Sequence, residues 1–168
     1  TKWYEANGLR FCRSYEKIIP HPLFQCTEEQ IQFFLHHLWS TDGNISYKIL
    51  PGRKTAGNIY YSSTSEKLAA QVQHLLLRVG IWAVKKKVLQ GAYRPIYHVY
   101  IQGAEMQIKF CDLVGSYGKR GIIVPALLTL LRDIEQNTNT DIIPKEAWKF
   151  LVEPAKAAIG ASWRDVAE

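Results

Sequence analysis

The sequence IQFFLHHLWSTDG occupies residues Ile31–Gly43 and predicts a helix that ends directly before a strand. Thr27 and Gln30 precede it at the spacing with which a hydroxyl and an amide satisfy free backbone groups at a helix start. Apolar residues then recur at helical spacing at Ile31, Phe34, Leu35 and Leu38. Gly43 is expected to close the helix in the left-handed conformation. The pattern therefore predicts that Asp42 presents one carboxylate at the point where the helix ends.

The positive charge of the chain is concentrated in its middle. The 168 residues carry a net charge of +6. Between Gly43 and Ala104, nine basic residues stand against one acid, Glu66, so this region alone carries +8. A charge of this sign is compatible with nucleic acid, an acidic membrane surface or an acidic protein as partner.

Two pairs of alternating strands are predicted in this basic region. In 44–50, Ser46 and Lys48 fall on the face opposite to the apolar residues, and a turn-rich loop with Arg53 and Lys54 leads to a strand at 58–62. After a helix over 68–79, the second pair spans 82–88 and 93–101. In that pair the alternation predicts that Lys85, Lys87, Arg94 and His98 lie on the polar face.

Helical spacing returns at 106–114 and at 122–135, with more helices in 137–168. The succession predicts an α+β fold with the order αββαββα, a four-stranded antiparallel saddle sheet and extra C-terminal helices. Helices covering one face of such a sheet leave the other face in solvent. We expect three segments: an N-terminal helical or linker segment at 1–26, the core at 27–136 and a C-terminal helical extension at 137–168.

The predicted open face suits double-stranded DNA. A twisted antiparallel ribbon fits the major groove, where alternate side chains reach base edges and loops reach phosphates. An ordinary solvated protein surface is the alternative, but a nearly acid-free region of this length on a predicted open sheet favours nucleic acid. The predicted contacts to bases or phosphates are Ser46, Lys48, Arg53, Lys54, Lys85, Lys87, Arg94 and His98.

A family resemblance supports this interpretation. Leu35–Gly43 resembles the LAGLIDADG motif of homing endonucleases, with agreement at Thr41-Asp42-Gly43 and departures at Ser40 and at His36-His37. The family carries an acid at the first of these positions and small residues at the other two. With the flanking Tyr60–Ala69, nearly the whole chain resembles the second repeat of the endonuclease domain carried by inteins in replicative helicases.

The resemblance implies a catalytic site. Asp42 is expected to bind Mg²⁺ together with the backbone carbonyl of Thr41, because hard divalent cations take oxygen ligands. One carboxylate cannot enclose the metal, so the second would come from a homodimer partner or a second LAGLIDADG half. By resemblance, Lys119 polarises the attacked phosphate or its water network; an ordinary loop lysine is the alternative, with Arg120 as the neighbour that could take the role.

The expected function is a site-specific DNA endonuclease that makes a double-strand cut with a divalent metal. The alternative is a non-cleaving protein of the same fold, such as a transcriptional regulator or an RNA maturase, and a degenerate remnant is a third possibility. Cys12, Cys26 and Cys111 lack zinc or disulfide spacing, and no apolar run is long enough for a membrane helix. We therefore expect an intracellular protein that is neither secreted nor bound to a membrane.

Overall fold

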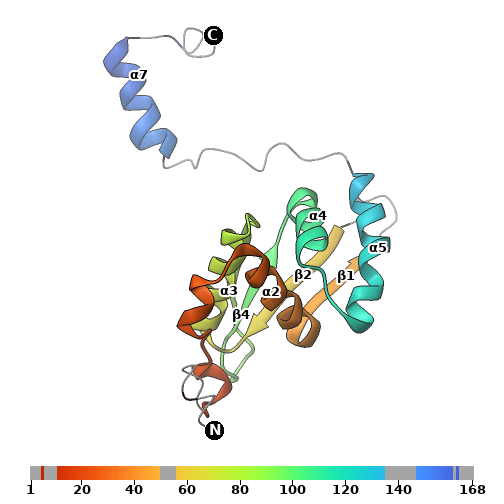
Figure 1. Cartoon of the computed structure of the whole chain (residues 1–168). Helices are drawn as coiled ribbons and strands as arrows, with labels where there is room; N and C mark the ends of the chain where they lie inside the picture. The colour runs from red at the N-terminus through yellow and green to blue at the C-terminus, as the bar shows by residue number, and fades with distance from the viewer. Residues whose placement is uncertain (1–4, 6–10, 50–55, 135–146, 161, 163–168) are drawn as a thin grey trace. The chain divides into compact units, whose positions relative to one another are not determined.

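The computed structural model describes residues 5, 11–49, 56–134, 147–160 and 162 (Figure 1). Arg53 and Lys54, which were predicted to lie on a hairpin loop, are outside the described residues. The chain divides into two compact units, Thr1–Gln136 and Asn137–Glu168. In the second unit, η4 (Trp148–Val152) leads directly into α7 (Glu153–Ile159). Within the described residues, no helix is both long and apolar enough to cross a membrane.

The first long helix forms as its sequence predicts. Two short turns, η1 (Ser14–Glu16) and η2 (His21–Gln25), lead to α2 (Glu28–Asp42). The amide of Thr27 donates to Gln30 Oε1 at 3.1 Å, and the amide of Gln30 donates to Thr27 Oγ1 at 3.4 Å. These reciprocal bonds confirm the predicted cap at the start of the helix.

Gly43 ends α2 in a way that the sequence did not predict. Its backbone is extended, with φ −78° and ψ 167°, so the expected left-handed conformation is wrong. A Cβ on Gly43 would lie 2.4 Å from Trp39 Cδ1 and 2.7 Å from Trp39 Cα. Glycine is needed here because the fully buried Trp39 ring fills the space that a side chain would occupy.

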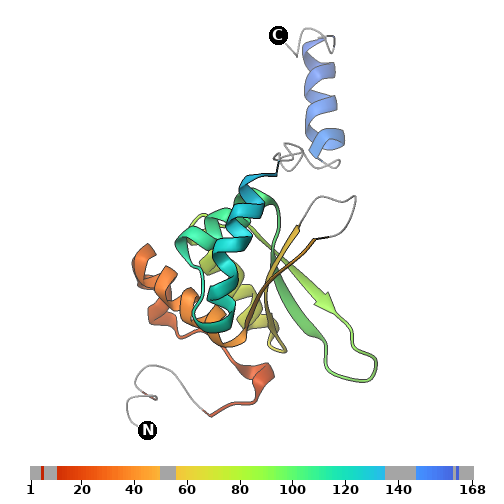
Figure 2. The same ribbon diagram turned by 90° about the vertical axis from the view of Figure 1, so that its right-hand side faces the viewer.

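The four strands form one antiparallel sheet in the order β1-β2-β4-β3. Helices α2, α3 (Glu66–Arg78), α4 (Ala104–Leu113) and α5 (Gly118–Arg132) gather on one face, and within the unit Thr1–Gln136 no described helix covers the other face (Figure 2). This arrangement confirms the predicted αββαββα order with one open sheet face and C-terminal helices. The strands are β1 (Gly43–Lys48), β2 (Ala56–Ser63), β3 (Ala83–Val88) and β4 (Ile96–Ile101).

The hydrophobic core lies between the helices and the covered face of the sheet. Trp39 is at its centre, with its ring centroid 4.9 Å from that of Phe110 and 5.7 Å from that of Tyr61. Burial of one aliphatic side chain contributes about 1.5–3 kcal/mol, so this core holds α2 firmly against the sheet. Other fully buried side chains include Ile31, Leu35, Ile59, Val72, Leu75, Ile101 and Leu127.

Candidate functional site

Asp42 and Thr41 lie at the C-terminal end of α2, and both are exposed. The Thr41 hydroxyl donates to the carbonyl of Leu38 at 3.1 Å, which fixes its side chain against the last helical turn. Burial, with a smaller contribution from the Asp42 carboxylate, raises the pKa of Tyr61 to about 12. The charge of Asp42 thus acts at the edge of the core while its carboxylate remains open to solvent.

Ser40 joins the end of α2 to the start of α5. Its hydroxyl accepts a hydrogen bond from the amide of Tyr117 at 2.8 Å, and its carbonyl accepts one from Arg120 Nη1 at 2.7 Å. Lys119 lies between these two partners in the sequence and is exposed. The structure therefore brings Lys119 to the same end of α2 as Asp42.

Lys119 was predicted to lie ahead of a helix beginning at Ile122, but α5 begins at Gly118 and includes it. The boundary prediction was wrong because the first turn is polar and apolar periodicity does not detect it. Gly121 permits this turn, since a Cβ at Gly121 would lie 2.2 Å from the carbonyl oxygen of Ser116. The lysine is consequently held by a helix and not by a free loop.

The oxygens at the end of α2 suit a hard divalent cation, but they do not enclose one. The Asp42 carboxylate is exposed, and the C-terminal end of a helix carries a partial negative charge that favours cations. Across the described parts of the chain, no group of three or more His, Cys, Asp or Glu side chains could hold a metal ion. A complete site would need acidic ligands from outside these residues.

The open face of β1 carries the polar side chains that the alternation predicted. Ser46 and Lys48 alternate with Ile45, whose side chain is buried in the core. Asn44 Nδ2 donates to Ser46 Oγ at 3.0 Å and to the carbonyl of Asn58 on β2 at 2.7 Å. The predicted placement of Ser46 and Lys48 is confirmed, and their contact with DNA stays a prediction.

The faces of β3 are the reverse of the prediction. Lys85 and Lys87 pair with the buried Val99 and Tyr97 of β4, so they lie on the helix-covered face. Lys85 Nζ is 3.1 Å from Glu66 Oε1, and this hydrogen bond lowers the pKa of the Glu66 carboxyl. The error arose because β3 is an edge strand, where the helix layer leaves positions on the covered side accessible to water.

Lys86 takes the place on the open face that was assigned to its neighbours. It pairs with His98 across β3 and β4, and its Nζ lies 5.7 Å from the centre of the Tyr100 ring. Sequence reasoning missed Lys86 because Lys85, Lys86 and Lys87 are consecutive, so a lysine falls on either face. The alternation of the strand alone does not say which of the two faces the helices cover.

His98 lies on the open face as predicted, within an aromatic cluster. Its ring stacks on Tyr100 at 5.4 Å between centroids and lies 5.1 Å from the ring of Tyr60. Its Nδ1 atom is buried and has no hydrogen-bond partner within the described part of the chain. Burial lowers the pKa of His98, so the ring is neutral at pH 7.

Arg94 lies outside the strand in which it was predicted. β4 begins at Ile96, and the guanidinium carbon of Arg94 lies 3.8 Å from the centre of the Tyr15 ring. Stacking on an aromatic ring leaves the edge of a guanidinium available for hydrogen bonds. Arg94 therefore lies just before β4, and its contact with DNA stays a prediction.

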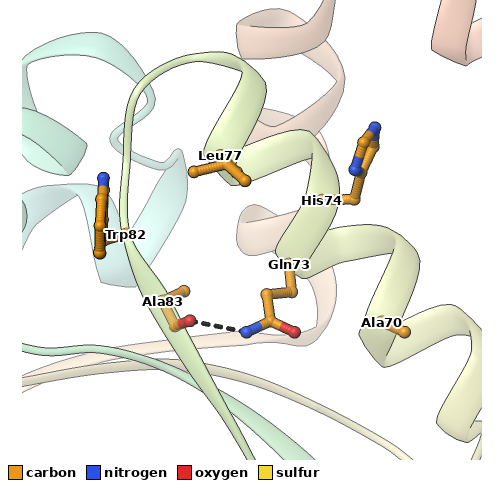
Figure 3. A pocket seen from close by; sticks show the side chains of 6 residues that line it. All are labelled: Ala70, Gln73, His74, Leu77, Trp82 and Ala83. Carbon is orange, nitrogen blue, oxygen red and sulfur yellow. Dashed lines mark hydrogen bonds between the residues drawn. The ribbon is translucent and has the colours of Figure 1, made fainter. Parts of the chain in front are cut away.

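A shallow apolar pocket lies at the opposite edge of the sheet from Asp42, between α3 and β3 (Figure 3). Gln73 Nε2 donates to the carbonyl of Ala83 at 2.8 Å across this pocket. None of the residues predicted to bind DNA or metal lines it. Its lining residues are Ala70, Gln73, His74, Leu77, Trp82 and Ala83.

Comparison with known proteins identifies the family of the chain. Residues 29–115 match the family of LAGLIDADG-like domains. Over 99% of its length the chain is 41% identical to proteins named replicative DNA helicase DnaB from Nostoc sp. and Synechocystis sp., and 40% identical to the one from Rhodothermus marinus. It spans only 18–19% of the length of these relatives. No solved structure matches the chain.

Proposed function

The chain belongs to the family of LAGLIDADG-like domains, and from this premise we propose that it is one half of a site-specific DNA endonuclease of the homing type. The single observation that carries the proposal is the position of Asp42. Its exposed carboxylate ends the motif helix immediately before β1, at the margin of an open antiparallel sheet. A duplex lying on that sheet would bring a phosphodiester within reach of this acid.

The open face is the proposed DNA-binding surface. Among the residues that the structure describes, it carries two cations, Lys48 and Lys86, and a polar row that includes Asn44 and Ser46. Cations neutralise phosphates and amide or hydroxyl groups read base edges, so this mixture fits a duplex better than it fits a lipid surface. His98 adds a half-buried, neutral ring in the middle of the face.

At the end of α2, Asp42 and the Thr41 carbonyl would hold Mg²⁺, with a second acid from the partner half. A metal bound there would activate water and stabilise the leaving oxygen. Lys119, in the first turn of α5, would place its ammonium group beside the attacked phosphate. The three residues lie at one end of the fold, and this placement supports the proposed division of roles.

The partner half would pack on the exposed side of α2. Phe33, His37 and Thr41 are exposed and four residues apart, so they form one stripe along the helix. Phe33 remains 63% exposed although its ring contacts that of His37 at 4.5 Å. A second copy of the chain or a second half of a longer protein would cover this stripe and bring a second acid to Asp42. An intracellular setting follows, because the substrate is chromosomal DNA.

A plasmid assay tests the proposal. Supercoiled plasmid carrying an uninterrupted replicative helicase gene is incubated with the protein and Mg²⁺, and nicked and linear products are measured. The wild type should cut, and Asp42→Asn should lose at least about a hundredfold in rate while its DNA affinity changes little.

The matched control for this assay is Asp112→Asn. Asp112 is also exposed, but it pairs with Arg132 at 3.4 Å near the far end of α5. This variant should cut like the wild type. Retained DNA binding without nicking by any of the three proteins would instead favour the non-cleaving binder.

A further inference from the structure

The segment that joins α4 to α5 is fastened to the motif helix at two successive turns of that helix. Ser40 accepts from the amide of Tyr117 at 2.8 Å and from Ser116 Oγ at 3.3 Å, and it donates to the carbonyl of His36 at 2.7 Å. A hydroxyl has one donor and two acceptor positions, so all three are used.

His36 lies one turn before Ser40 and holds the other end of the same segment. Its Nδ1 atom lies 2.5 Å from the carbonyl oxygen of Val114, and its ring packs edge-on against Tyr117 at 4.0 Å between centroids. Ser40 and His36 are two of the positions at which the chain departs from its family motif. The structure gives these two departures a common role, since both bind Val114–Tyr117.

Arg120 completes the attachment. The last carbonyls of a helix lack partners within the helix, and Arg120 Nη1 donates to the carbonyl of Ser40 at 2.7 Å. A charged donor at a negative helix end makes a strong hydrogen bond. Arg120 therefore ties the first turn of α5 to the last turn of α2, two residues from Asp42.

We propose that Ser40 and Arg120 are positioning residues that hold Lys119 in a fixed place relative to Asp42. Lys119 lies between two residues that are both bonded to Ser40, so its backbone cannot move independently of the end of α2. This inference rests on the proposed nuclease function, in which Asp42 binds the metal and Lys119 reaches the phosphate. Ser40 and Arg120 themselves need not touch the substrate.

Serine suits this role better than the acid of the family motif. An ionised carboxylate only accepts hydrogen bonds, so it could not donate to the carbonyl of His36 as the Ser40 hydroxyl does. It would also add a second negative charge two residues from Asp42. The chain thus keeps a neutral link at position 40 and one acid at position 42.

The first test measures the attachment without any cleavage reaction. Amide hydrogen exchange of Tyr117 is followed in the full chain for the wild type, Ser40→Ala and Arg120→Lys. Loss of one hydrogen bond, worth about 1 kcal/mol, should speed exchange about five- to tenfold in Ser40→Ala. Arg120→Lys should also speed it, because an ammonium group does not reproduce the planar geometry of the guanidinium.

Arg78→Lys is the matched control for that test. Arg78 also donates from its guanidinium to backbone carbonyls, those of Phe24 and Cys26, just before the start of α2. A helix of 15 residues is about 22 Å long, so this contact is remote from Ser40. Arg78→Lys should leave the exchange of Tyr117 unchanged; unchanged exchange in Ser40→Ala would overturn the proposal.

The second test measures cleavage as separate kcat and KM values. In Ser40→Ala and Arg120→Lys, kcat should fall about ten- to a hundredfold, because the catalytic group Lys119 would be misplaced. KM for DNA should stay within about twofold of the wild-type value. Ser40→Thr keeps the hydroxyl and should recover most of the rate. A wild-type kcat in Arg120→Lys would show that only charge matters there and would overturn the positioning role.

The two tests separate this inference from the proposed function. If no variant and no wild-type protein cuts DNA while Tyr117 exchange still accelerates in Ser40→Ala, the nuclease proposal fails and the attachment of Lys119 stands. If the wild type cuts and Ser40→Ala cuts equally fast, the nuclease proposal stands and the positioning role fails.

Discussion

Lys86 and Lys85 are neighbours in the sequence, but they lie on opposite faces of the sheet. Lys86 Nζ lies over the Tyr100 ring on the open face, whereas Lys85 Nζ bonds Glu66 on the helix-covered face. Two neighbouring side chains of the same charge therefore differ in the face they occupy and in the groups they contact.

This difference predicts how each lysine contributes to DNA binding. Lys86→Ala should weaken binding and lower the dependence of log K on log salt by about 1, because one phosphate contact and its released counterion are lost. Lys85→Ala should leave both quantities nearly unchanged. Fluorescence anisotropy with a labelled duplex over a range of salt concentrations measures them, and equal losses in the two variants would contradict the assignment of faces.

His98 should make the stability of the protein fall as the solution is acidified. Burial lowers its pKa in the folded state, so below the ordinary value of about 6.5 the unfolded chain binds more protons. The stability contribution of neutral His98 is full above about pH 6.5 and is lost as the pH falls through the lowered pKa.

Urea unfolding of His98→Gln between about pH 7 and 5 checks this window, and the midpoint should fall less steeply than in the wild type. His21→Gln is the control, because His21 is exposed at the start of η2. A His98→Gln midpoint that follows the wild-type curve would rule out His98 as the source of the pH dependence.

Gly43→Ala should destabilise the folded protein for a steric reason. The new Cβ would lie 2.7 Å from Trp39 Cα, a backbone atom that cannot move aside cheaply. We expect a loss of about 3 kcal/mol in the free energy of unfolding, at the upper end of overpacking effects.

Gly91→Ala provides the comparison for Gly43→Ala. Gly91 has a φ of +56° and nothing within 4 Å of an added Cβ, so only backbone strain of about 1–2 kcal/mol applies. Denaturant titration of both variants measures the difference, and a smaller loss for Gly43→Ala than for Gly91→Ala would mean that Trp39 does not set the requirement for glycine.

Phe33→Asp should weaken association with the second half of the nuclease. The side chain is exposed on the stripe of α2 that the partner helix would cover, and a buried, unpaired carboxylate is unfavourable. Sedimentation velocity with and without DNA should show at least about a tenfold weaker self-association. Phe11→Asp is the control, because Phe11 is fully exposed on the N-terminal segment, and equal effects of the two variants would argue against the stripe.

Several features were determined by the sequence alone because they depend on neighbours along the chain. The cap formed by Thr27 and Gln30, the order of helices and strands, and the placement of Asp42 at a helix end all follow from local spacing. The family motif at Thr41-Asp42-Gly43 also requires no tertiary information.

Other features were decided only by the tertiary structure, because they depend on segments distant in the sequence. Which face of β3 is open depends on its pairing with β4, and the need for glycine at Gly43 depends on the packing of Trp39. In the sequence, Ser40 is only a departure from the family motif. In the structure it contacts Tyr117 and Arg120, which are 77 and 80 residues away along the chain. Alternation and helical periodicity indicate that a strand or helix has two different faces, whereas long-range packing determines which face is buried.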